Sequence, residues 1–263
     1  MIAVKDLKSV APAISRRDYI LNDLNPLKPV LGIGFTELDM RVSSTYLFKQ
    51  EELCATHQLS YIKLVKQYRD LDNRAKAFYG KVESIETALK ANLDLSGLDD
   101  FQISKYRIRD SIYTEEMYLN NIKSLVDQHF IVGLWVLTEQ TIAKVLEVFY
   151  DLSGLSSKIP FRWDETLKLF QSLSLNTDEN LEIYKNINEL RVLNNKIKHL
   201  NKVDAKLSEF DYFKNMLNEP IDKISLELQR YSDYSCAFIY FIVEQLEVVI
   251  LNGTPLKNDN SHR

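Results

Sequence analysis

The segment 183–202 holds the side chains best suited to chemistry in this sequence. In a helical projection of about 100° per residue, its apolar residues share one side and its polar residues another. The residues from Lys185 to Lys206 include six Lys or Arg against two acids, a local net charge of +4 in a chain of net charge −4. Local positive charge suits contact with phosphate. The polar side comprises Arg191, Asn195, Lys198, His199 and Lys202.

Histidine and arginine on one helix face can act together on a phosphodiester. Histidine titrates near neutral pH and can take up or return a proton, so His199 is a candidate general acid or base. Arginine can hold a phosphate and offset developing negative charge, which fits Arg191. The alternative interpretation is a solvated basic helix face with a histidine near its end.

The stretch ELRVLNNKIKHLNK resembles the signature helix of the HEPN superfamily (higher eukaryotes and prokaryotes nucleotide-binding). Members are all-helical, and many are ribonucleases whose motif is an arginine, four to six residues, then a histidine. In the common form Arg-Asn-x-x-x-His, the equivalent positions are Asn194, Asn195 and His199, so the arginine is replaced by asparagine. Arg191 lies upstream, with seven residues between it and His199. The resemblance covers roughly residues 104–252.

The resemblance implies metal-independent RNA cleavage, without a cofactor, by a toxin or phage-defence effector. Two motif helices would face each other across a homodimer. The implied catalytic residues are His199, Arg191, Asn195 and Asn194, with Glu139 as the acid that the family often carries on an earlier helix. The lysines expected to contact RNA are Lys196, Lys198 and Lys202.

Three alternatives stay open at this point. The chain could be a HEPN-like scaffold that lost catalysis with the replaced arginine, or an unrelated helical module that binds a protein partner, so enzymatic activity is undecided. Glu139 could instead pair with a buried lysine or arginine. Replacing Asn194 with arginine would then test whether an active site has decayed.

The elements that must position these residues are helices. Apolar residues recur at alternating spacings of three and four from Tyr61 to Leu89, which is a heptad pattern. Turn residues follow at 94–101, and a similar pattern resumes at Ile108 and continues to about Ser153. These patterns predict a long antiparallel helical hairpin.

Shorter helices are expected beyond the hairpin. We expect helices at 163–173 and at 177–201, the latter started by Thr177, Asp178 and Glu179. Pro220 should open a last helix that ends at Leu251. The prediction is an all-α fold with an irregular arm over 1–45, a hairpin over 46–127, a HEPN-like bundle over 128–252 and a polar tail over 253–263.

Composition restricts the protein class and the compartment. The 263 residues include 7 glycines and 6 prolines, which leaves long stretches without helix breakers. Cys54 and Cys236 are too far apart in sequence to indicate a disulfide framework, and the first residues lack a signal-peptide core. The apolar segment 236–251 is shorter than a bilayer span and carries two glutamates. We therefore expect a soluble cytoplasmic protein without a membrane span.

Two further patterns do not support a site. Cys54 and His57 have half of a zinc-site spacing, but no second pair follows. Tyrosines on the hairpin could stack on bases, although aromatic residues at helical spacing more often pack in a core or an interface. The tyrosines expected to pack are Tyr61, Tyr68, Tyr106, Tyr113 and Tyr118.

Overall fold

The computed structural model describes residues 9–11, 37–92, 98–155 and 158–252. These residues form α-helices and short 3₁₀ turns, and the described part of the chain contains no β-strand beyond a bridge between Lys202 and Pro220. The prediction of an all-α fold is confirmed. Contacts divide the chain into two units, residues 1–9 with 55–128 (the hairpin unit) and residues 10–54 with 129–263 (the bundle unit).

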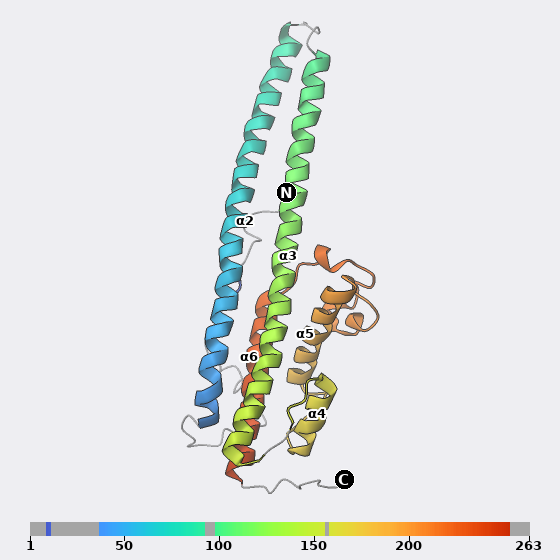
Figure 1. Ribbon diagram of the computed structural model, residues 1–263. Helices are drawn as coiled ribbons and strands as arrows, with labels where there is room; N and C mark the ends of the chain where they lie inside the picture. Colours follow the sequence, from blue (N-terminus) through green and yellow to red (C-terminus); the bar gives the residue numbers. More distant parts are fainter. Residues whose placement is uncertain (1–8, 12–36, 93–97, 156–157, 253–263) are drawn as a thin grey trace. The chain divides into compact units, whose positions relative to one another are not determined.

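Two helices of 56 residues each, α2 (Glu37–Asn92) and α3 (Leu98–Ser153), contribute residues to both units (Figure 1). Neither helix contains a proline, so the backbone hydrogen-bond ladder can continue through both. Residues 37–45 are helical, so the prediction of an irregular arm reaching residue 45 is wrong for these residues. The strand suggested by VLGIGF lies outside the described residues.

Within the hairpin unit, α2 and α3 pair in antiparallel fashion, as the cross-helix bonds show. Residues successively later in α2 bond to residues successively earlier in α3. The pairs are Tyr61 with Asp127, Tyr68 with Asn120, Arg74 with Glu115 and Glu86 with Lys105. A small core of Tyr61, Leu64, Tyr68, Leu71 and Leu119 lies between the helices. The heptad pattern weakens toward the turn, where Ile85 and Ile108 are exposed.

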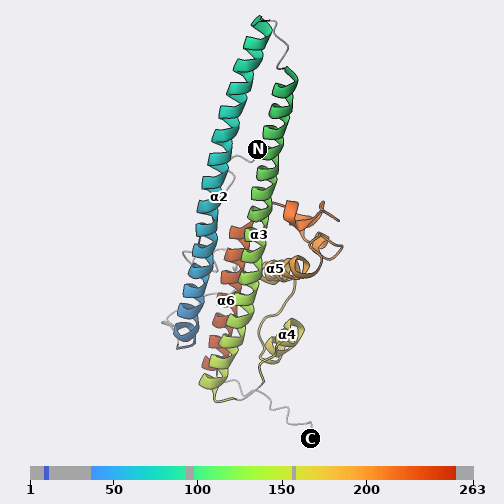
Figure 2. The ribbon, with the colours of Figure 1, turned by 45° about the horizontal axis from the view of Figure 1, so that its top comes forward.

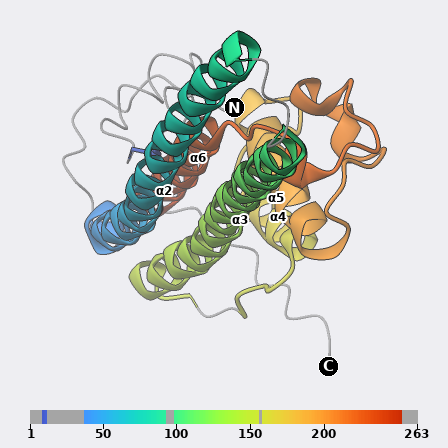
Figure 3. The same ribbon diagram turned by 90° about the horizontal axis from the view of Figure 1, so that it is seen from above.

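Within the bundle unit, α6 (Leu228–Leu251) is the central helix (Figures 2 and 3). Ser235 on α6 shares hydrogen bonds with Tyr46 of α2 at 2.9 Å and Thr138 of α3 at 2.6 Å. Phe238 on α6 contacts the rings of Trp163 on α4 (Trp163–Ser172) and Tyr184 on α5 (Glu182–His199). Helix α6 therefore contacts α2, α3, α4 and α5.

Two helix starts differ from the sequence prediction. Helix α5 begins at Glu182 rather than Thr177, because the Asp178 carboxylate accepts hydrogen bonds from Asn180 and closes a separate turn. Pro220 precedes the 3₁₀ turn η4 (Ile221–Lys223), and α6 begins only at Leu228. Two further 3₁₀ turns, η2 (Leu207–Glu209) and η3 (Asp211–Phe213), lie between α5 and η4.

Helix α6 is longer than the apolar segment 236–251 that the sequence analysis compared with a bilayer span. Of the helices in the described part of the chain, α6 is the one long and apolar enough to span a membrane. Half of its most apolar 18-residue stretch is buried inside the protein. Ser232 and Ser235 on this helix are buried and bonded to α2 side chains. Length and composition thus permit a bilayer span, whereas these contacts are typical of a core helix.

Candidate nucleic-acid interface

The candidate site is a line of polar side chains along α5, which we call the α5 line: Asn188, Arg191, Asn195 and His199. Their spacings of three and four residues place them on one face of the helix. The opposite face is apolar and packs in the bundle core, where α5 contacts α6. Asn188 and Arg191 are half-buried, whereas Asn195 and His199 are exposed. Burial of the apolar face therefore directs the line outward.

Arg191 is held by an amide rather than a carboxylate. Its Nε and Nη2 donate to Asn188 Oδ1 at 3.1 and 2.7 Å, and Nη1 has no hydrogen-bond partner among the described residues. Burial lowers the pKa of Arg191, although the charges of Asp164 on α4 and Glu139 on α3 act in the opposite direction. Neither acid lies within the 4.0 Å of an ion pair. The guanidinium is thus fixed in place but keeps donors for an anion.

The same result locates Glu139, the acid suggested by the resemblance. Glu139 is exposed on α3 and lies close enough to Arg191 for its charge to act on the guanidinium. It forms no ion pair with a lysine or arginine in the described part of the chain. The structure therefore brings Glu139 and Arg191 into one region without direct contact.

His199 is the last residue of α5 and is exposed. The helix ends there because Asn201 adopts a left-handed conformation (φ 47°), and the amides of Leu200 and Asn201 both donate to Lys196 O. His199 lies eight residues beyond Arg191, which is about 12 Å along the helix axis at 1.5 Å per residue. Within one chain, these two side chains therefore do not converge on a single phosphate.

Asn194 lies in the core rather than on the α5 line. It is 1% exposed, and its Nδ2 is 3.4 Å from Asn195 Oδ1. Its Oδ1 is buried without a hydrogen-bond partner. The position that the HEPN motif gives to arginine is therefore turned inward, and the site expected from the sequence loses this residue.

The three lysines assigned to RNA contact differ in their surroundings. Lys196 forms an ion pair with Asp204 at 2.5 Å and is largely buried. Lys198 and Lys202 are exposed, and no described carboxylate lies within 4.0 Å of either. Lys198 and Lys202 therefore keep their charge available for phosphate, and Lys196 instead holds the segment after α5.

Glu189 on α5 is buried and paired, which the sequence analysis missed. Arg230 Nη2 on α6 donates to Glu189 Oε1 at 2.7 Å, and the Tyr231 hydroxyl donates to the same oxygen at 2.7 Å. Burial, together with the charge of Glu189, raises the pKa of Tyr231 well above its usual range. This cluster fixes α5 to α6. The sequence signal that could have predicted this burial is the position of Glu189 next to the apolar face of the predicted helix.

A second buried polar cluster, also missed, lies in the hairpin unit. Asp127 Oδ1 accepts from Tyr61 OH at 2.5 Å and from His57 Nε2 at 3.2 Å, and Oδ2 accepts from Lys123 at 2.8 Å. Burial would raise the pKa of Asp127, but these hydrogen bonds outweigh it and lower the pKa. Because the cluster is shielded from solvent, it stabilises the pairing of α2 and α3 rather than reaching a substrate.

No family model, no curated protein and no solved structure matches this chain. Among the described residues, no group of three or more His, Cys, Asp or Glu is placed to hold a metal ion. The HEPN resemblance rests on the residues of α5 and on the order of the helices. The features of this chain that bear on function are therefore those of the α5 line.

Proposed function

We propose that this chain is a HEPN-like protein that binds RNA along the α5 line, and that two copies together form an endoribonuclease. The observation that carries the proposal is the fixation of Arg191 by the neutral amide of Asn188. An arginine held by a carboxylate would already be neutralised. Here the guanidinium is oriented by an amide and no described carboxylate contacts it, which leaves donors for a phosphate oxygen.

Charge and exposure along the helix support binding to a polyanion. Exposed Lys198 and Lys202 follow Arg191 toward the end of α5, and neither has a described acidic partner. Successive phosphates of a single strand could contact these side chains in turn, which makes binding depend strongly on salt. The exposed amide of Asn195 supplies a donor and an acceptor for a base or a ribose.

Cleavage requires a second copy because of the distance between Arg191 and His199. In the proposed reaction, His199 of one copy removes the proton from a ribose 2′-hydroxyl, whose oxygen attacks the adjacent phosphorus. The bond between phosphorus and the 5′-oxygen breaks, which leaves a 2′,3′-cyclic phosphate, and the 5′-oxygen takes up a proton from water. Arg191 of the other copy offsets the negative charge that develops on the phosphate.

The second candidate is a non-catalytic scaffold that binds RNA or a protein partner. Asn194 favours it, because the structure buries the position that the motif gives to arginine. This candidate keeps binding along the α5 line and lacks cleavage. The two candidates therefore differ in RNA cleavage, which can be measured.

The remaining proposals follow from the first. If the chain cleaves RNA inside a cell, it acts as a toxin or a phage-defence effector in the cytoplasm. The contacts of α6 with α2, α3, α4 and α5 support a core role for this helix and hence a location away from the membrane.

Binding is tested by fluorescence anisotropy with a labelled single-stranded RNA over a series of salt concentrations. Lys198→Ala and Lys202→Ala should each weaken binding and reduce the slope of log K against log salt by about 1. Lys63→Ala is the matched control, because Lys63 is an exposed lysine in the hairpin unit. Equal effects of all three substitutions, or no binding by the unaltered protein, would refute the RNA-binding proposal.

A further inference from the structure

The hairpin unit carries an apolar stripe on α3 that nothing in its own core covers. Ile103, Tyr106, Tyr113 and Met117 are 50%, 58%, 61% and 48% exposed. Together with Asp110, these four residues form the series 103, 106, 110, 113 and 117. The spacing in this series alternates between three and four residues. This is the a/d spacing of a helix that packs lengthwise against another helix.

The stripe faces away from the hairpin core. Ile112 and Leu119 on α3 pack in that core, and a helical projection places the stripe roughly 140° from them. Aromatic side chains, methionine and arginine are enriched where proteins bind each other. The stripe is therefore a second packing face on α3.

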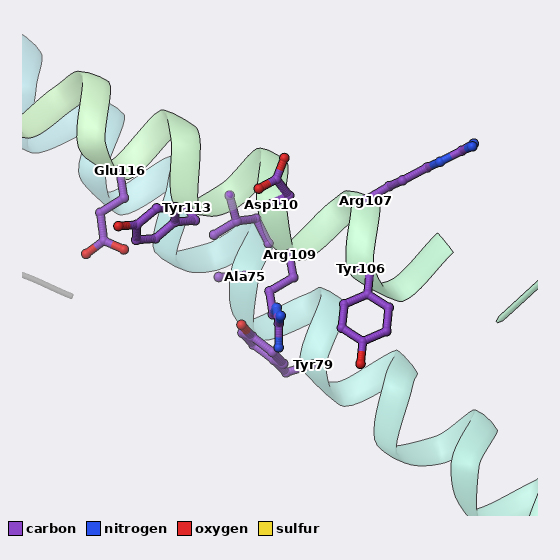
Figure 4. Close-up of a pocket in the computed structure, with 9 residues that line it drawn as sticks. Ala75, Tyr79, Tyr106, Arg107, Arg109, Asp110, Tyr113 and Glu116 are labelled. Carbon is purple, nitrogen blue, oxygen red and sulfur yellow. The ribbon is translucent and has the colours of Figure 1, made fainter. Parts of the chain in front are cut away.

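A groove lined by positively and negatively charged side chains borders the stripe (Figure 4). Arg109 and Glu116 line it from α3, and Tyr79 lines it from α2. Figure 4 shows Arg109 reaching toward Tyr79, and the guanidinium carbon of Arg109 lies 5.0 Å from the centre of the Tyr106 ring. Arg109 and Glu116 are one heptad apart, so they flank the stripe on the same side.

We propose that the stripe binds the same stripe of a second copy in antiparallel orientation. Antiparallel packing pairs equivalent flanking positions of the two helices, which brings Arg109 of each copy beside Glu116 of the other. The same register sets Tyr106 against Met117. Parallel packing would instead face Arg109 with the neutral Thr114. Charge complementarity therefore selects both the occupant and its direction.

The net charge of the hairpin supports a second copy over nucleic acid. Residues 55–128 contain eleven Lys or Arg and eleven Asp or Glu. Two neutral hairpins do not repel each other, whereas two basic α5 lines do. A neutral surface also lacks the attraction that RNA requires. This inference does not rest on the proposed RNA binding, because it concerns a different helix surface.

The test is the molar mass of the full chain, measured by light scattering over a dilution series. Tyr113→Asp should convert the dimer to a monomer, because in this register it sets a second carboxylate against Asp110 of the other copy. Tyr118→Asp is the matched control: Tyr118 is 62% exposed on the same helix but lies off the stripe, so the dimer should persist. If Tyr113→Asp loses helicity, Met117→Lys replaces it as the disrupting variant.

Charge reversal tests the orientation. Arg109→Glu and Glu116→Arg should each weaken the dimer about tenfold, since each sets like charges against each other in two symmetric pairs. The double reversal should restore most of the affinity. A monomer at every concentration, a dimer unaffected by Tyr113→Asp, or a double variant weaker than both singles would overturn the proposal. So would a monomer in which Tyr113→Asp abolishes RNA binding, which would assign the stripe to RNA.

Discussion

Arg191 donates two hydrogen bonds to Asn188 Oδ1, from Nε at 3.1 Å and from Nη2 at 2.7 Å. The partner carries no charge, so Asn188→Asp would turn the contact into an ion pair. We expect this substitution to weaken RNA binding about tenfold, as expected when a hydrogen bond between charged groups is lost. Asn188→Ala should have a smaller effect, because the guanidinium loses its orientation but keeps its charge.

Fluorescence anisotropy with single-stranded RNA measures both variants. Asn73→Asp adds the same charge at an exposed asparagine of the hairpin unit and serves as the control. If Asn188→Asp and Asn73→Asp change the affinity equally, the effect is one of net charge, and Arg191 does not contact the RNA.

Asn194 gives the clearest prediction on stability. Its Oδ1 is buried without a partner, so Asn194→Leu should stabilise the protein by about 1 kcal/mol. Asn194→Arg should destabilise it by several kcal/mol, since it would bury an unpaired charge, and it should not create cleavage activity. Thermal unfolding followed by circular dichroism measures both, with Asn195→Leu as the exposed neighbour. Stable folding of Asn194→Arg would contradict the placement of Asn194 in the core.

The sequence predicted the α5 helix and its polar stripe, because apolar residues at helical spacing determine which side is buried. The helical projection placed Asn195, but not Asn194, on the polar side, and the structure likewise exposes Asn195 and buries Asn194. The resemblance nevertheless counted both as catalytic, because a motif match takes no account of the side of the helix on which a residue lies. The pairing of Glu189 with Arg230 could not be predicted from the sequence. That pair depends on how α6 packs against α5, and no local pattern encodes that packing.

Asp127 should determine how the hairpin unit responds to acid. Hydrogen bonds from His57, Lys123 and Tyr61 lower its pKa in the folded state, despite burial. A carboxylate with a lowered pKa stabilises the fold above its unfolded pKa of about 3.9, and this contribution is lost as pH falls through the folded value. Stability of the unaltered protein should therefore fall below about pH 4.

The Asp127→Asn variant isolates this contribution. At pH 7 it should be destabilised by about 3 kcal/mol, as expected for the loss of one partner of a buried charge pair. Its thermal midpoint should then change less between pH 7 and pH 3 than that of the unaltered protein. Asp70→Asn, at an exposed position of the same unit, should leave both values unchanged. If the thermal midpoints of Asp127→Asn and of the unaltered protein fall equally between pH 7 and pH 3, other groups cause the response to acid.

The hairpin shows a second limit of sequence reasoning. The heptad pattern correctly predicted the seam at Tyr61 and Tyr68, which are buried. Tyr106, Tyr113 and Tyr118 were expected to pack in a core or an interface, and all three are more than half exposed within this chain. Spacing shows that residues share a helix face, but it does not show whether another helix of the same chain covers that face.

The most direct test of the account is cleavage of a labelled single-stranded RNA by the unaltered protein and by His199→Ala. His199 is exposed at the end of α5, so its removal should leave the thermal midpoint and the affinity for RNA nearly unchanged. Cleavage should fall at least about 100-fold, as expected for loss of a general acid or base. Equal cleavage by both proteins, or RNA binding without any cleavage by the unaltered protein, would contradict the nuclease proposal and leave the scaffold.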